Sequence, residues 1–218
     1  QDVVIDGSAG CPVLAVTDNV PDPAALAEFF ANTNCFSFQE LFPGGFTPNF
    51  CGYVTDTSFL SGLRGQMNNG LAWDASVSQG SNEVDFFIFN TVNASLGPNT
   101  PTSFDPGLYR QDELNVNFDV SYAINDQTNL AGGVEWREED FEIGIGQLES
   151  YQIGALAEQG FSAASNGFPG FGPIAAGSWG RSNYAVYVDL ERTSGDDKWT
   201  FGAAIRFEDF EDFGTTTH

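Results

Sequence analysis

Basic side chains are scarce in this sequence. Its 218 residues include 7 lysines and arginines against 30 aspartates and glutamates, which gives a formal net charge of −23. Nucleic-acid binding draws most of its affinity from clustered Lys and Arg, so we expect no nucleic-acid partner. Hydrophobic residues still make up 41% of the chain and aromatic residues 14%. That apolar content predicts an ordered structure rather than a disordered acidic chain.

Long apolar runs are also missing. The richest run, Phe86–Phe89, is interrupted within a few positions, so the sequence predicts no transmembrane helix. The first residues, Gln1–Asp6, lack the basic start and the apolar stretch of a signal peptide. We expect any such segment to have been removed or to lie upstream.

Catalytic and zinc-binding motifs are equally lacking. The single histidine is the terminal His218, and there is no CxxC, GxSxG or phosphate-binding loop. We therefore expect no enzyme, no cofactor and no zinc site. The three cysteines, Cys11, Cys35 and Cys51, all lie in the first quarter of the chain. They predict one disulfide formed in an oxidising compartment, with one thiol left over.

Two sequence features could mark a calcium site or a glycosylation site, but neither is specific. The calcium-ligand candidates in the acidic clusters are Glu138, Glu139, Asp140, Glu208 and Asp209. Without EF-hand spacing, the favoured interpretation is a solvated acidic surface, and no metal site is expected. Asn93–Ser95 matches the glycosylation sequon, which we interpret as coincidental.

The chain changes character near residue 57. Residues 1–57 are rich in Pro, Gly, Asn and Phe and show no sustained alternation. They predict a loop-rich region with one short helix over Asp22–Ala31, where Asp22 is the N-cap and Pro23 the first helical residue. Residues 58–218 predict a second region, in which apolar and polar residues alternate with the period of a β-strand.

Three hairpins follow from this alternation. They turn at Asn68–Gly70, Asn125–Thr128 and Ser194–Asp197. Val84–Phe89 and Phe141–Ile145 are expected to extend their strands outward. The prediction is an all-β, antiparallel, up-and-down barrel segment of about six to eight strands, each crossing about ten residues.

Each hairpin has one apolar and one polar face. This pattern also fits a soluble sandwich, but short turns opposite the long connections 91–111 and 146–182 favour an outer-membrane barrel, as do aromatic residues at strand ends. The residues expected to face lipid or a partner are Leu71, Trp73, Val116, Phe118, Val120, Tyr184, Val186, Val188, Phe201, Ile205 and Phe207.

Several runs resemble one known family when they are taken in their linear order. They include Phe42–Pro48, Trp73–Ser76, Asn90–Pro98, Gly132–Arg137 and Tyr187–Glu191. Together they resemble the barrel of a TonB-dependent receptor over nearly the whole chain. The resemblance implies an outer-membrane barrel of about 22 strands, plugged by an N-terminal domain, that imports siderophores, cobalamin, sugars or similar ligands.

The chain departs from that family pattern. It has no plug domain, no TonB box and no final strand ending in an aromatic residue, so we expect an internal barrel segment that is no competent transporter alone. Its implied location is the bacterial outer membrane, with residues 1–57 as an extracellular loop. Its implied partners are the remaining plug and barrel, and TonB only through the missing N-terminal part. The resemblance also implies a Cys11–Cys35 disulfide, with Cys51 free or intermolecular.

Two other functions remain open. One is a structural protein derived from such a receptor, in which further copies of the chain pair through open strand edges into an extracellular filament or oligomer. The other is a soluble β-sandwich binding module. A need for detergent distinguishes the membrane segment from both.

Overall fold

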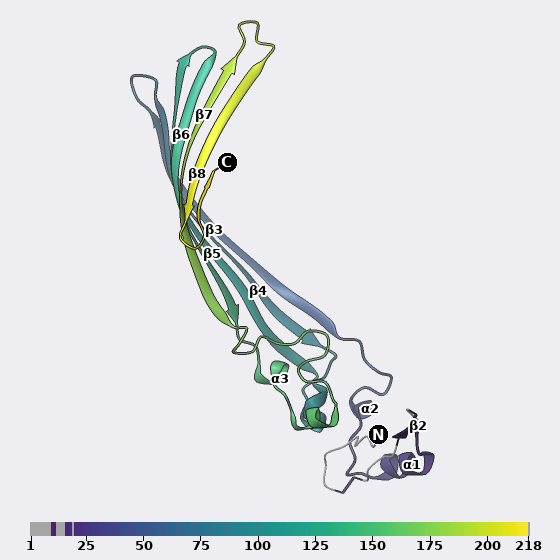
Figure 1. Ribbon diagram of the computed structural model, residues 1–218. Coiled ribbons are helices and arrows are strands. Elements are labelled where there is room, and N and C mark those ends of the chain that lie inside the picture. Colours follow the sequence, from purple (N-terminus) through teal and green to yellow (C-terminus); the bar gives the residue numbers. More distant parts are fainter. Residues whose placement is uncertain (1–9, 12–15, 19, 218) are drawn as a thin grey trace. The chain divides into compact units, whose positions relative to one another are not determined.

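Seven strands form one antiparallel sheet in the computed structural model, which describes residues 10–11, 16–18 and 20–217. The strands follow one another in sequence order, β3-β4-β5-β6-β7-β8-β9 (Figure 1). Their bounds are Asn49–Gln66 (β3), Ala72–Phe89 (β4), Ser103–Asn125 (β5), Thr128–Gly144 (β6), Gly177–Thr193 (β7), Thr200–Phe210 (β8) and Gly214–Thr217 (β9). The expected all-β, antiparallel, up-and-down fold of six to eight strands is confirmed.

The remaining elements are short. They are strands β1 (Val16–Thr17) and β2 (Val20–Pro21), helices α1 (Pro23–Ala31), α2 (Phe38–Leu41) and α3 (Leu148–Tyr151), and the 3₁₀ segments η1 (Ala94–Asn99) and η2 (Ala155–Gln159). None of the helices in the described part of the chain has the length and hydropathy to cross a membrane.

Local sequence accounts for the helix starts. The Asp22 carboxylate accepts a hydrogen bond from the Ala25 amide at 2.8 Å, and Pro23 opens α1 as expected. Ser37 and Glu40 form a capping box at the start of α2. These caps satisfy amide groups that have no partner within the helix.

The three predicted turns join the strands. In the first, Gly70 adopts a positive φ of 88°, which glycine tolerates without steric cost. In the third, the Trp199 amide donates to the Ser194 hydroxyl, which donates in turn to Asp196 at 2.7 Å. That hydrogen bond lowers the pKa of the exposed Asp196 carboxyl by stabilising its charged form.

Strands β3 to β7 are longer than the expected crossing of about ten residues. Each spans 17 to 23 residues. In β4 and β6, the expected extensions are present at residues 84–89 and 141–144. The strand β3 begins at Asn49, so a boundary after residue 57 falls inside it.

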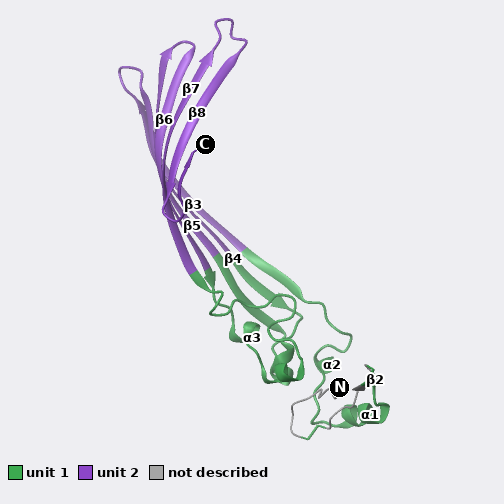
Figure 2. Ribbon diagram, viewed as in Figure 1, with its two compact units in different colours: residues 1–53, 84–109, 143–177 green, residues 54–83, 110–142, 178–218 purple. Residues whose placement is uncertain are grey.

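The described residues form two compact units, coloured separately in Figure 2. The first unit draws on the ranges 1–53, 84–109 and 143–177, and the second on 54–83, 110–142 and 178–218. The first holds the helices and the long connections, and the second holds the tight turns.

The second unit contains very little apolar core. Ala185 is its one buried apolar residue among those described, whereas Ile88, Val92, Phe104 and Leu156 are all buried in the first unit. Hydrogen bonds between strands, not apolar side-chain packing, therefore hold this unit together.

One side chain in the second unit reaches across a neighbouring strand. The Tyr187 hydroxyl on β7 donates to the Asp119 carboxylate on β5 at 2.8 Å, although β6 lies between them. The crossing passes Gly133, where an added Cβ would lie 2.2 Å from Asp119 Oδ1 and 2.6 Å from Tyr187 Cε1. Gly133 is therefore required by close packing.

We expect Gly133→Ala to break this contact and to lower the free energy of unfolding by about 1–3 kcal/mol through overpacking. The measurement is urea unfolding of the refolded chain in detergent micelles, followed by tryptophan fluorescence. The matched control is Gly202→Ala on β8, where no atom lies within 4 Å of the added Cβ. Equal effects of the two substitutions would contradict the packing role of Gly133.

Candidate functional site

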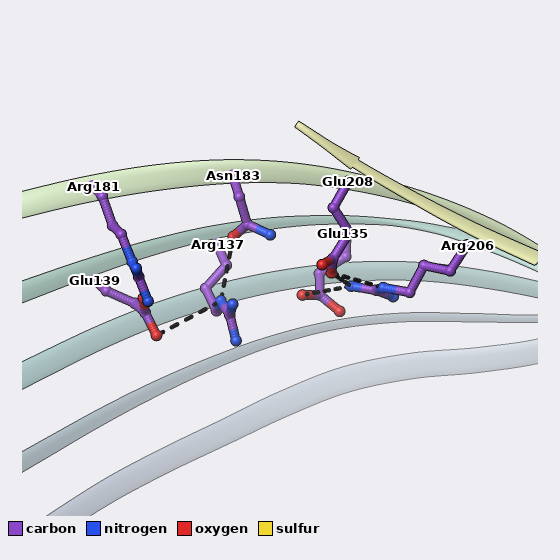
Figure 3. A network of polar contacts seen from close by, with 7 residues as sticks. All are labelled: Glu135, Arg137, Glu139, Arg181, Asn183, Arg206 and Glu208. Atoms are coloured by element: carbon purple, nitrogen blue, oxygen red, sulfur yellow. Dashed lines mark hydrogen bonds and ion pairs between the residues drawn. The ribbon is translucent and has the colours of Figure 1, made fainter. Parts of the chain in front are cut away.

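A network of charged side chains covers one face of the second unit (Figure 3). Glu139 on β6 accepts a hydrogen bond from Arg181 Nε on β7 at 2.6 Å, and its other oxygen lies 3.8 Å from Arg137 Nε. Arg206 on β8 joins Glu208 at 2.7 Å and Glu135 at 3.3 Å. Three of the seven basic side chains of the protein thus lie in one network.

The center of this network holds a buried amide. Asn183 is 3% exposed, and its oxygen accepts a hydrogen bond from Arg137 Nε at 3.2 Å. Its nitrogen has no hydrogen-bond partner in the structure. A buried donor without a partner costs free energy, so the strong pairs around it must hold the amide in place.

The opposite face of the same strands is apolar. The register of β7 and β8 pairs Val186 with Phe207 and Val188 with Ile205, and these side chains remain exposed. Side chains alternate across a strand, so Tyr187 and Arg206, which are also paired, lie on the charged face.

The residues expected to face lipid or a partner differ in their exposure. Phe118, Val116, Tyr184 and Phe201 are exposed, whereas Val120 and Trp73 are half-buried. Trp73 packs over Gly65 on β3, and Leu71 lies in the turn before β4.

A second ion cluster lies closer to the long connections along the strands. Arg110 on β5 donates from Nε to Glu83 on β4 at 2.9 Å, and its Nη1 lies 3.3 Å from Glu142 on β6. Alternation along β6 puts Glu142 on the face that carries Val134. The apolar face therefore becomes charged toward this end of the strands.

The five weak calcium candidates do not converge. Glu139 and Glu208 are held by arginines in the network above, while alternation turns Glu138 and Asp140 to the other face of β6. Asp209 is paired with Tyr184 across β7 and β8. Within residues 10–11, 16–18 and 20–217, no group of three or more His, Cys, Asp or Glu side chains is placed to hold a metal ion.

Buried hydrogen bonds in the first unit lock two long connections together. Asn93 is fully buried, and its Nδ2 donates to the carbonyl oxygens of Glu149 at 2.9 Å and Gln152 at 3.0 Å. Its Oδ1 accepts from the Ser95 hydroxyl at 2.7 Å. Thr91 donates to the carbonyl of Asn166 at 2.6 Å. The amide of the sequon is thus used inside the fold, where no glycan can be attached.

Stacked aromatic rings reinforce these connections. Phe168 stacks on Phe50 with ring centroids 4.2 Å apart, and Phe171 stacks on Tyr109 at 4.9 Å. Phe86 contacts both Phe168 and Phe171. The connection between β6 and β7 is therefore anchored on the strand ends at several points.

Cys11 and Cys35 form a disulfide, with their Cα atoms 5.0 Å apart. It links positions on either side of helix α1. Cys51 on β3 is free and exposed.

The charged network was not anticipated from the sequence, although one signal was present. Glu135, Arg137 and Glu139 follow one another at a spacing of two on β6, which places them on one face. Which residues of β7 and β8 they contact depends on the register between the strands. That register cannot be inferred from the residue spacing within a single strand.

Comparison with known proteins identifies one family. The family model described as "TonB dependent receptor-like, beta-barrel" matches residues 17–218. No curated protein matches the chain. No solved structure matches it either.

We expect Asn93→Ala to loosen the two connections, because it leaves the partly buried carbonyl groups of Glu149 and Gln152 without their donor. The cost should be about 1–3 kcal/mol, and hydrogen exchange should speed up at 91–100 and 147–170. The control is Asn82→Ala, which removes an exposed hydrogen bond to Asp56. Unchanged exchange in the Asn93 variant would show that this amide does not hold the connections.

Proposed function

Because this chain belongs to the TonB-dependent receptor-like β-barrel family, we propose that it forms part of an outer-membrane receptor for the uptake of a ligand such as a siderophore, cobalamin or a carbohydrate. The members of this family are receptors and transporters rather than enzymes. The observation that carries the proposal is the sharp difference between the two faces of the sheet.

The apolar face has the height that a lipid bilayer requires. On β7 its exposed apolar residues run from Tyr184 to Leu190, and on β5 they run from Val116 to Ile124. The two stretches cover 7 and 9 residues, and together with the residues at their ends they support a tilted strand crossing of about nine to eleven residues. On β6 this face is charged from Glu138 onward. That charged stretch, with the Arg110 ion cluster beside it, then marks where the strands leave the hydrocarbon. The long strands therefore include a part outside the bilayer, which explains why ten residues underestimated them.

The charged face fits the interior of a barrel. A transmembrane barrel alternates apolar residues toward lipid with polar residues toward its lumen. The ion pairs of Glu139 and Arg206 would be costly in hydrocarbon but are tolerated in a solvated lumen.

The open edges of the sheet support a proposal for the partners. Among the described residues β3 pairs only with β4, and β9 covers β8 only at Phe207–Phe210. Open edges seek further strands. We propose that the remaining barrel strands occupy them, that a plug fills the lumen, and that TonB acts through the plug.

The long connections are assigned to the extracellular side. In outer-membrane barrels, short turns are periplasmic and long loops are extracellular. The connections at 90–102 and 145–176 and the region 1–57 are therefore proposed to face outward. The Cys11–Cys35 disulfide supports an oxidising location for that region.

Two adjacent residues on β8 provide the test. Ile205 lies on the apolar face and Ala204 on the charged face, since their register partners are Val188 and Asp189. We expect Ile205→Arg to lower the stability of the chain refolded into vesicles by about 2–4 kcal/mol, because its charge enters the hydrocarbon. Ala204→Arg faces the lumen and should cost much less.

The native chain should also precipitate in buffer without detergent. Monodisperse particles in water, together with equal effects of the two arginines, would overturn the membrane assignment. Large uniform particles would point to self-assembly through strand edges, and a monomer would point to a soluble module.

A further inference from the structure

A pocket in the second unit combines exposed aromatic rings with hydrogen-bonding groups. Its volume is about 310 Å³, and its lining includes Gln111 on β5, Glu139 and Phe141 on β6, and Trp179 and Arg181 on β7. We call it the Trp179 pocket. Its size lies at the lower end of the range of small-molecule sites.

The aromatic pair is unusual for its position. Phe141 and Trp179 stack with ring centroids 6.4 Å apart and an interplanar angle of 27°. Trp179 is 53% exposed. Alternation places both rings on the face that carries Glu139 and Arg181, where most side chains are polar. Exposed apolar surface within a polar face is typical of a ligand contact rather than of a core.

The polar groups of the pocket supply both donors and acceptors. Arg181 donates to Glu139 at 2.6 Å, which fixes both side chains and neutralises both charges. Figure 3 shows the two side chains pointing toward each other from neighbouring strands. The Gln111 amide adds two donors and an acceptor. A hydroxyl group, which both donates and accepts, can bond to any of these groups.

We infer that the Trp179 pocket binds a neutral carbohydrate. The stacked rings offer a flat apolar surface for the C–H face of a sugar ring, and Gln111, Glu139 and Arg181 are placed beside it for the hydroxyl groups. This inference rests on the proposed receptor function and names the class of its ligand.

Ionic ligands fit the pocket less well. Asp212 also lines it beside Glu139, so an anion would meet carboxylates, and the one lining arginine is already paired. A cationic ligand would have to compete with Arg181 for Glu139. A neutral polyhydroxyl ligand meets neither penalty.

The test is binding of neutral disaccharides to the full chain. Sucrose, maltose and cellobiose are each titrated with the chain in lauryldimethylamine oxide, a detergent without a sugar headgroup. Saturation transfer to the sugar C–H protons and tryptophan fluorescence report binding. We expect Trp179→Ala and Gln111→Ala to weaken the affinity for a bound disaccharide by about tenfold each.

The matched control is Trp199→Ala, which removes an exposed tryptophan outside the pocket. It should leave the affinity unchanged, and circular dichroism of all three variants should retain the β-sheet spectrum of the parent chain.

Three results would overturn the inference. The first is the absence of saturation transfer for all three sugars, and the second is equal binding by the Trp179 variant and the parent chain. Binding of citrate or spermidine in place of the sugars would likewise overturn it in favour of an ionic ligand. A chain that needs detergent but binds no sugar refutes the carbohydrate site alone. A chain that stays dispersed in water refutes the receptor function itself.

Discussion

Hydrogen bonding between neighbouring strands is the interaction on which this structure depends. In the second unit most large apolar side chains are exposed, and Ala185 is the one buried apolar residue described there. A soluble sheet would need a second layer over its apolar face. Here the backbone hydrogen bonds between strands must hold the sheet together, while one face is apolar and the other is charged. That requirement also explains the uninterrupted strands, since each gap would leave backbone groups unpaired.

Close contacts between strands refine this ladder. The Tyr187 ring reaches Asp119 over the space left by Gly133, and Trp73 lies over Gly65. In both cases a large ring covers a residue that has no side chain. Such pairs fix the register of a sheet that has little apolar core to specify it. The charged network of Arg137, Arg181 and Arg206 adds contacts among β6, β7 and β8 on one face.

Local features were predictable from sequence to different degrees. The cap at Asp22, the turn at Asn68–Gly70 and the alternation along β7 each depend on neighbouring residues, and each was predicted correctly. Strand lengths were underestimated because alternation of apolar and polar residues marks only the apolar stretch. Beyond it, residues such as Glu83 and Glu142 are charged on the face that was expected to be apolar.

The candidate site was harder to predict because its parts come from different strands. Phe141 was expected only as a strand extension, and nothing local connects it with Trp179, since the long β6–β7 connection separates them in sequence. The Arg181–Glu139 pair likewise depends on the β6–β7 register. The role of Asn93 could not be predicted from the sequence for a similar reason, because its partners Glu149 and Gln152 lie more than fifty residues away.

The buried hydrogen bonds of Asn93 have a consequence for recognition. Loops that order only when a partner arrives lose conformational entropy at that moment, which weakens binding. The connections at 90–102 and 145–176 are already ordered by Asn93, Thr91 and the stacked phenylalanines. Whatever meets this surface therefore encounters a preorganised shape, and selectivity there rests on complementarity rather than on induced fit.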